Sequence, residues 1–406
     1  MNRDAIFAII ALAASALAVH GAPAADPARD FAKELVYQKQ DVDDWLNGKN
    51  PFAQYSGEFG WLLNDSLTKD GVDGSACRYT YLDGGQGPRK MINHADKPCR
   101  INAYGDSFVQ CHQVSDGETW EEALAAHLGE PIRNFGVGGW SVYQAYLRML
   151  REEAKTPAEF IIFNIYSDDH YRNLDAWRSI RVTRQPGGFG EVTLPYVEVN
   201  VAEGTLSEHP NPCPTPESIY NLCDVDWVLD RFKDDFVFKL MLMHRTAADA
   251  AVDTQYDDLK KLSTTFGINT RVDDAEAFSE QAWKIHLEAA LFATEQIVER
   301  IEAFAKENNK KVLYVLSYNS YEVGRMLKEG RRFDAAFIQY LDEKGLPYVD
   351  LMQKHVEDYK KYKCSEVEYL EQYFIGHYNP RGNFFHAWAI KDAVVEMLDP
   401  KPEAYR

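Results

Sequence analysis

The run EFIIFNIY, residues 159–166, decides the fold of this chain. Its apolar residues follow one another without regular polar alternation, which is typical of a strand buried on both faces of a parallel sheet. Parallel strands need long crossover connections, which are usually helices. We therefore expect helical segments on both sides of this strand.

Strand and helix do alternate in the flanking sequence. The spacing of Thr119 and Glu122 ahead of ALAAHL is a helix N-cap signal. Five strands separated by helices predict an α/β fold, a three-layer α/β/α sandwich with a five-stranded parallel sheet of the flavodoxin-like kind. The predicted strands are 99–105, 131–137, 159–166, 311–318 and 346–351, and the clearest helices begin at Thr119 or cover 142–154, about 280–308 and 382–398.

Two parts of the chain do not follow this alternation. Residues 25–98 are rich in Gly, Tyr and Trp and predict an irregular or β-containing N-terminal layer. Residues 176–309 interrupt the sandwich, with a hairpin expected at 181–200 and helices after it, so we interpret them as an inserted cap or subdomain. The sandwich itself is then built from residues 99–175 and 310–398.

The first 24 residues have the layout of a signal peptide. Arg3 precedes an apolar run from Ala5 to Val19, and small residues follow, with cleavage expected after Ala24. No later run reaches 18 apolar residues, so we expect no membrane insertion. These features predict an exported protein, periplasmic or extracellular.

Charge and cysteine content narrow the possible partners. A net charge of −19 argues against nucleic acid and anionic membrane surfaces. The six cysteines have no zinc-site spacing, and an exported protein favours disulfides, with Cys213–Cys223 and Cys77–Cys99 as the expected pairs. The oligomeric state stays open.

Four polar or glycine-rich stretches come where strands end or a helix begins. AYGDSFVQC (103–111) places Ser107 just past the first strand, and NFGVGG (134–139) follows the second. YSDDH (166–170) ends the third strand, and GHYNPRG (376–382) places His377 before the last helix. Ligands of such sheets bind at the carboxyl ends of the strands. The glycines lack the GxGxxG spacing of a dinucleotide site, so no nucleotide cofactor is expected.

The order of these stretches resembles the SGNH, or GDSL-type, hydrolase superfamily over the sandwich segments. The resemblance implies that Ser107 is a nucleophile and that His377 is its general base. It also implies that the backbone N–H groups of Ser107 and Gly139 stabilise the oxyanion, without a metal or other cofactor. A serine needs such a base and such donors to react with an ester.

The sequence departs from that pattern at two positions. Asp168, followed by Asp169, stands where the family has an oxyanion-stabilising Asn. A neutral Asp168, an amide from Asn164 or Asn173, or a different chemistry would each account for this.

The second departure is Phe374, which replaces the acid that precedes the catalytic histidine. We expect Asp350, at the end of the fifth strand, to orient His377; a Ser-His dyad and a helix-capping Asp350 are the alternatives. Asp169, His112 and His170 are candidate substrate contacts, whereas His386 falls within the final helix and is expected to pack there.

Three functions remain open at this point. The first is an esterase that removes acyl groups, acetyl above all, from a glycan or another small ester. The second is an O-acetyltransferase that acts on an exopolysaccharide, which the resemblance also allows. The third is a glycan-binding module or a glycosidase that uses Asp168 and Asp169 as its carboxylate pair.

Overall fold

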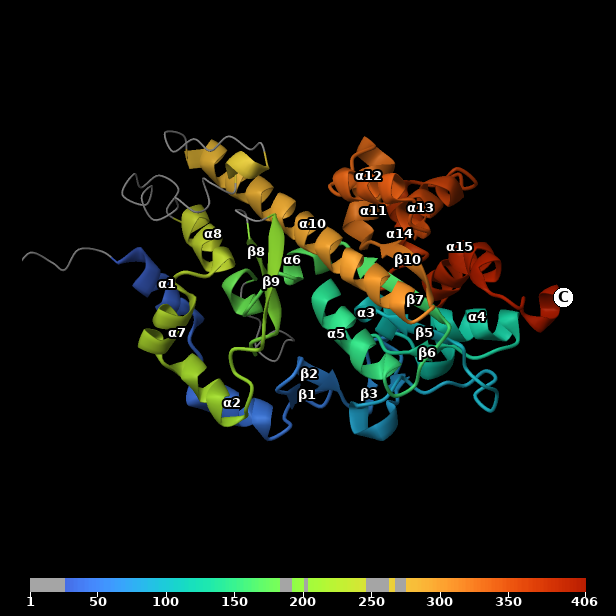
Figure 1. Cartoon of the computed structure of the whole chain (residues 1–406), viewed down its shortest axis with the longest axis horizontal. Helices are drawn as coiled ribbons and strands as arrows, with labels where there is room; N and C mark the ends of the chain where they lie inside the picture. The colour runs from blue at the N-terminus through green and yellow to red at the C-terminus, as the bar shows by residue number, and fades with distance from the viewer. Residues whose placement is uncertain (1–25, 183–191, 201–203, 246–262, 267–274) are drawn as a thin grey trace, which may run out of the picture.

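The computed structural model describes residues 26–182, 192–200, 204–245, 263–266 and 275–406 (Figure 1). The signal-peptide prediction lies outside these ranges. Within them, no helix is long and apolar enough to cross a membrane.

A five-stranded, all-parallel sheet forms the centre of the fold, as predicted. Its spatial order is β11-β10-β7-β5-β6. β7 is the central strand, and its residues are buried except for the last, Tyr166, which is partly buried. It pairs with β5 on one side and with β10 along its whole length on the other. The strands are β5 (Ile101–Tyr104), β6 (Arg133–Asn134), β7 (Phe160–Tyr166), β10 (Lys311–Ser317) and β11 (Tyr348–Asp350).

The strand order fixes where a ligand can bind. The chain runs from β5 outward to β6, and then returns across β5 to β7 on the other side. This reversal is the topological switch point of a flavodoxin-like sheet, and ligands bind outside the carboxyl ends of the strands there. The polar residues that follow β5 and β7 are therefore brought to one edge.

The helices that contact the sheet form two groups. α5 and α10 pack on each other and on the sheet, whereas α15 contacts α4, α13 and the strands β10 and β11. Two such groups cover the two faces of the sheet, which completes the predicted layers (Figure 1). The helices of the sandwich are α4 (Trp120–Leu128), α5 (Val142–Glu153), α11 (Ser320–Glu329), α12 (Ala335–Lys344), α13 (Leu351–Tyr359), α14 (Glu366–Glu371) and α15 (Pro380–Met397).

The N-terminal layer contains two helices besides the expected short strands. β1 pairs with β2 and β3 with β4, both antiparallel. The helices were not foreseen because PARDFAKEL and KQDVDDWL are short and strongly polar. The elements are α1 (Pro27–Leu35), α2 (Lys39–Leu46), β1 (Ala53–Ser56), β2 (Gly60–Leu63), β3 (Ser66–Thr68) and β4 (Cys77–Tyr79).

The segment between β7 and β10 is mainly helical and packs on the N-terminal layer. α1 contacts α7 and α8, so segments that are distant in sequence lie side by side (Figure 1). The antiparallel pair is formed by residues 196–200 and 205–209, later than the expected 181–200, part of which lies outside the described residues. The elements are β8 (Tyr196–Asn200), β9 (Thr205–His209), α7 (Val225–Phe232), α8 (Phe236–Arg245) and α10 (Ala275–Glu307).

The expected disulfides are not formed. All six cysteines lie in the described ranges, and the structure contains no S–S bond among them. The Cys99 thiol donates instead to the carbonyl oxygens of Ile101 and Pro131, at 3.2 and 3.3 Å. The buried Cys111 thiol lies 3.3 Å from a Glu121 carboxylate oxygen.

Candidate functional site

Ser107 opens a four-residue helix, α3 (Ser107–Gln110), directly after β5. Asp106 caps this helix, since its Oδ1 accepts a hydrogen bond from the Phe108 amide at 2.9 Å. Gly105 makes the turn possible: its φ is 156°, and a Cβ there would lie 3.0 Å from the Asn164 carbonyl oxygen. The turn presents Ser107 at the switch point with its side chain largely shielded.

His377 meets Ser107 from the other end of the chain. Its Nε2 lies 2.8 Å from Ser107 Oγ, although 270 positions separate the two residues. The Gln113 side-chain oxygen accepts a 2.7 Å hydrogen bond from the His377 amide. The next residue, Tyr378, is held by a 2.7 Å bond between its hydroxyl and His355 Nε2. The structure thus brings together the two residues that the sequence singled out.

The His377 imidazole is held in its neutral form. Burial lowers the pKa of His377 to about 3, and electrostatic interactions with the neighbouring His112 and Arg172 act in the same direction. A neutral Nε2 can accept the Ser107 proton at any pH well above that value. In the described part of the chain, no hydrogen-bond partner is found for the other ring nitrogen, Nδ1.

His112, one of the three candidate substrate contacts, lies beside this pair. Its ring centroid is 4.9 Å from that of His377, and it stacks on Phe52 at 5.2 Å. Its Nε2 lies 3.1 Å from Asp70 Oδ2. The N-terminal layer therefore contributes one wall of the site through Phe52 and Asp70.

The glycine loop after β6 packs directly against the Ser107 turn. A Cβ at Gly136 would lie 2.2 Å from the Gln110 amide nitrogen, and one at Gly138 would lie 3.6 Å from Ser107 Cβ. Two carbonyl oxygens of the loop accept hydrogen bonds from other elements. The Gly138 oxygen accepts from Trp61 Nε1 at 3.0 Å, and the Gly139 oxygen accepts from Arg178. No acceptor for the Gly139 amide occurs among the described residues, so this amide is available to a ligand.

Asp168 is not the neutral acid that the sequence allowed. Burial alone would raise its pKa, but the charges of Arg181 and Arg172 outweigh burial and hold the pKa of Asp168 well below its usual range. Its Oδ1 binds Arg181 at 2.9 Å and its Oδ2 binds Arg172 at 2.8 Å. Asp168 is therefore a charged carboxylate engaged with two arginines.

The two alternative amides are also engaged elsewhere. Asn164 Nδ2 donates to Ser317 Oγ at 2.9 Å. Asn173 Nδ2 donates to Thr294 Oγ1 at 2.9 Å, and its oxygen accepts from the Tyr143 amide. Both amide groups are therefore engaged within the fold.

Asp169 and His170 are buried away from solvent. Burial and the nearby Asp106 charge raise the pKa of Asp169 well above its usual range, although Arg172 binds it at 2.7 Å. His170 Nδ1 bonds to Thr294 Oγ1 at 2.9 Å, and its ring packs on Phe337. Neither side chain contacts Ser107 or His377, so the structure does not bring these two candidates into the site.

Asp350 takes the helix-capping alternative. Its Oδ1 accepts from the Met352 amide at 2.9 Å, at the start of α13, and its Oδ2 binds Arg332 at 2.7 Å. Within the described part of the chain, its carboxylate makes no hydrogen bond with His377. The expected orienting role is therefore not seen, and Ser107 and His377 form a dyad. His386 is packed as expected, stacked on Trp120 at 4.7 Å.

Sequence reasoning missed Arg172, Gln113 and Asp70. The four-residue spacing of Asp168 and Arg172 on one helix would have indicated an ion pair. Gln113 follows Ser107 closely in the sequence, but nothing there marks it as a hydrogen-bond acceptor for the His377 loop. Asp70 carries no signal at all, because only the fold brings its loop to this edge.

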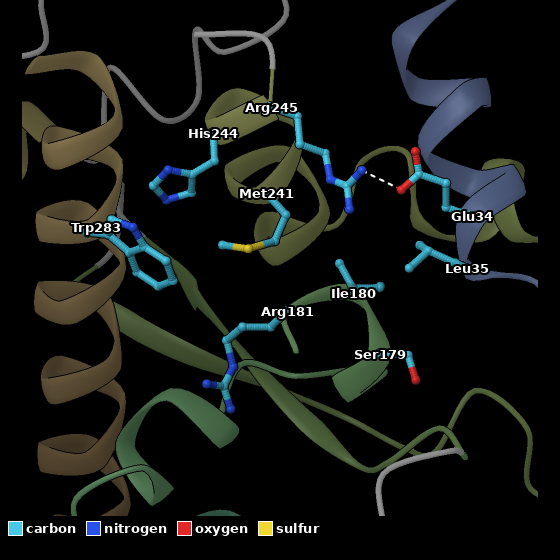
Figure 2. A pocket seen from close by; sticks show the side chains of 9 residues that line it. All are labelled: Glu34, Leu35, Ser179, Ile180, Arg181, Met241, His244, Arg245 and Trp283. Carbon is cyan, nitrogen blue, oxygen red and sulfur yellow. Dashed lines mark hydrogen bonds and ion pairs between the residues drawn. The ribbon is translucent and has the colours of Figure 1, made fainter. Parts of the chain in front are cut away.

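A separate pocket lies between α1, α8, α10 and the short helix η4 (Arg178–Ile180) (Figure 2). Its volume is about 360 Å³, and its residues do not include Ser107 or His377. Figure 2 shows Arg245 reaching across to Glu34, while Trp283 forms the opposite wall beside His244. The lining residues are Glu34, Leu35, Ser179, Ile180, Arg181, Met241, His244, Arg245 and Trp283.

Comparison with models of known protein families gives no match, and no curated protein matches the chain. In the ranges that the structure describes, no cluster of three or more His, Cys, Asp or Glu side chains could hold a metal ion.

Proposed function

We propose that this protein is an exported serine esterase of the SGNH type, which removes O-acyl groups, acetyl first of all, from a carbohydrate. The observation that carries the proposal is the 2.8 Å contact between Ser107 Oγ and His377 Nε2 at the switch point of the sheet. A nucleophile within hydrogen-bond reach of a neutral base is the arrangement that acyl transfer requires. The signal-like N-terminus and the Phe52 ring stacked on His112 beside the pair support an extracytoplasmic sugar substrate.

The reaction follows from these positions. Ser107 gives its proton to His377 Nε2 while Oγ attacks the acyl carbon, and the carbonyl electron pair moves to the oxygen. The amides of Ser107 and Gly139 donate to this oxyanion. The intermediate collapses when the C–O bond to the sugar breaks and the sugar oxygen takes the proton from His377. Water then repeats the sequence on the acyl-serine, which releases the carboxylic acid and restores Ser107.

One contact competes with this reaction. Asp106 Oδ2 lies 3.1 Å from Ser107 Oγ and is a second acceptor for the single hydroxyl proton. Only molecules in which the hydroxyl points to His377 are poised for attack. The longer distance to Asp106 favours that orientation.

The test is a comparison of the wild type with Ser107→Ala and His377→Gln on 4-nitrophenyl acetate and on a panel of acetylated glycans. Both variants should lose almost all turnover, and only a protein with Ser107 should be labelled by a fluorophosphonate. His386→Phe is the matched control, since this second late histidine is packed on Trp120 and should leave turnover unchanged. A wild type that hydrolyses no acyl ester and is not labelled would contradict the proposal.

Product analysis in the presence of a glycan acceptor separates hydrolysis from transfer. Free acetate as the only product supports the esterase. If an acetylated acceptor forms and its formation requires Ser107, the protein is an O-acetyltransferase and not an esterase. If the Ser107→Ala variant still cleaves a glycosidic bond, the protein is a carboxylate-dependent glycosidase and not an esterase.

A further inference from the structure

We propose that Arg172 is a catalytic residue of this site and that its Nη2 group donates to the acyl oxygen in the place of the missing asparagine amide. The inference rests on the proposed acyl-transfer function. It deepens that function by assigning the third oxyanion donor to a cation.

The position of the guanidinium is fixed by its neighbours. Arg172 Nε donates to Asp168 at 2.8 Å, and Nη1 donates to Asp169 at 2.7 Å and to the Trp140 carbonyl at 3.1 Å. Its central carbon lies 5.4 Å from the centroid of the Tyr166 ring. Three hydrogen bonds and an aromatic face leave the group little freedom, which is what a preorganised donor needs.

The same guanidinium lies at the Ser107 turn. Nη1 is 3.5 Å from Asp106 Oδ2, and that oxygen is 3.1 Å from Ser107 Oγ. The Tyr166 ring beneath Arg172 stacks on Phe108 at 4.7 Å, and Phe108 in turn packs on the His377 ring. A positive charge is therefore held next to the nucleophile and its base.

One nitrogen of the group remains available. Nε and Nη1 hold all three acceptors of Arg172, and across the described ranges neither N–H of Nη2 has an acceptor. Nη2 is not among the fully enclosed polar atoms that lack a partner, and the Arg172 side chain keeps 11% of its area exposed. Its neighbours explain why a cation is needed here: Asp168 is charged, and the amides of Asn164 and Asn173 point elsewhere.

Substitution of Arg172 tests the proposal by its effect on kcat. Arg172→Lys keeps a charge against Asp168 and Asp169, but its single amine cannot bind both and also donate to the substrate. We expect kcat on 4-nitrophenyl acetate to fall about 10²- to 10³-fold, as for loss of one oxyanion donor, with KM within about threefold. Added ethylguanidinium should restore part of kcat in Arg172→Ala.

Arg181→Gln is the control for a purely structural effect. Arg181 shares the Asp168 carboxylate but lines the separate pocket (Figure 2). We expect this variant to lower the unfolding temperature and to leave kcat within a few-fold. An equal fall of kcat in Arg181→Gln and Arg172→Lys would overturn the proposal, as would a folded Arg172→Lys with unchanged kcat.

A third measurement needs no substitution. In a crystal structure of the wild type labelled at Ser107 by a methylphosphonate, we expect the phosphonyl oxygen within hydrogen-bond distance of Arg172 Nη2. A separation of more than about 4 Å would overturn the inference. A wild type that is neither labelled nor active on any ester would instead contradict the proposed function itself.

Discussion

At His377, the environment that keeps the base neutral also makes its charged form costly. In the described part of the chain no carboxylate binds Nδ1, so the imidazolium that forms during attack depends on the oxyanion of the tetrahedral intermediate for its main compensating charge. The Asp70 carboxylate lies one ring away, where its Oδ2 contacts His112 Nε2 at 3.1 Å and accepts from the Tyr79 hydroxyl at 2.7 Å. The dyad therefore depends on strong stabilisation of the oxyanion more than a full triad would.

The pH dependence of kcat/KM should report this environment. Burial lowers the pKa of His377 to about 3, so the base stays unprotonated as the pH falls through 6.5. We expect kcat/KM for a neutral ester to be flat between pH 8 and pH 5. The profile should be measured together with intrinsic fluorescence, which shows that the protein is still folded. An acid limb with a midpoint near 6.5 in folded protein would contradict this prediction.

Removal of the Asp350 charge should have little effect on catalysis. Its carboxylate caps α13 and binds Arg332, and Asn can still accept from the Met352 amide. We expect Asp350→Asn to change kcat less than fivefold and to lower the free energy of unfolding by about 1–3 kcal/mol, because Arg332 loses a charged partner. Esterase kinetics and denaturant unfolding measure both. A loss of several orders of magnitude in kcat would restore Asp350 as the orienting acid.

At the scale of elements, the α3 turn and the glycine loop after β6 form one unit. Because Gly136 has no side chain, the loop contacts the backbone of α3. This contact fixes the position of Ser107 relative to the loop. On its other side the turn contacts β7, because Gly105 lies close to the Asn164 carbonyl oxygen. The positions of both oxyanion amides then depend on contacts between two backbone segments.

Gly136→Ala should disrupt this unit. The added Cβ would lie 2.2 Å from the Gln110 amide nitrogen, and backbone on both sides would have to move. We expect a loss of about 1–3 kcal/mol of stability and at least a tenfold loss of kcat, because the displaced amides no longer meet the oxyanion.

Gly117→Ala is the matched control for this change. Gly117 is exposed, and a Cβ there would meet no atom within 4 Å. We expect its kinetics and unfolding to match the wild type. A Gly136→Ala protein with the same kcat as Gly117→Ala would show that the loop tolerates the shift.

The strands and the central pair of residues could be predicted because their signals are local. EFIIFNIY and KVLYVLSY are continuous apolar runs, and Ser107 and His377 stand in short motifs next to predicted elements. The orientation of Asp168 and Asp350 could not be predicted, because it depends on Arg181 and Arg332, which only the folded chain brings to them. The position of Asp70 beside His112 could not be predicted for the same reason. The length of the short strand β6 could not be predicted either, because it depends on where the glycine loop leaves the sheet.

At the scale of the whole molecule, three buried histidines make no ion pair with any residue that the structure describes. Burial lowers the pKa of His355 and His386 to about 3 and that of His170 to about 4. The unfolded chain binds protons at these positions near pH 6.5, whereas the native protein does not. Each of them therefore lowers stability as the pH falls below 6.5.

His386→Phe should make the protein more resistant to acid. Neither ring nitrogen of His386 has a partner in the described part of the chain, and its ring stacks on Trp120. Relative to the wild type, we expect the variant to gain about 2 kcal/mol of unfolding free energy between pH 7.5 and pH 5, since a tenfold change in proton concentration corresponds to about 1.4 kcal/mol. Urea unfolding at both pH values measures the difference, and parallel curves would contradict it.

The long segment between β7 and β10 has a consequence for how the chain is made. On the ribosome, β5, β6 and β7 emerge before β10, and the edge of β7 that will pair with β10 then waits for the whole inserted segment. At about 5–20 residues per second, that delay is on the order of ten seconds. Throughout it, an apolar strand offers unsatisfied backbone groups to any other nascent chain. We therefore expect synthesis rate and holding chaperones, more than final stability, to limit the yield of this protein in cells.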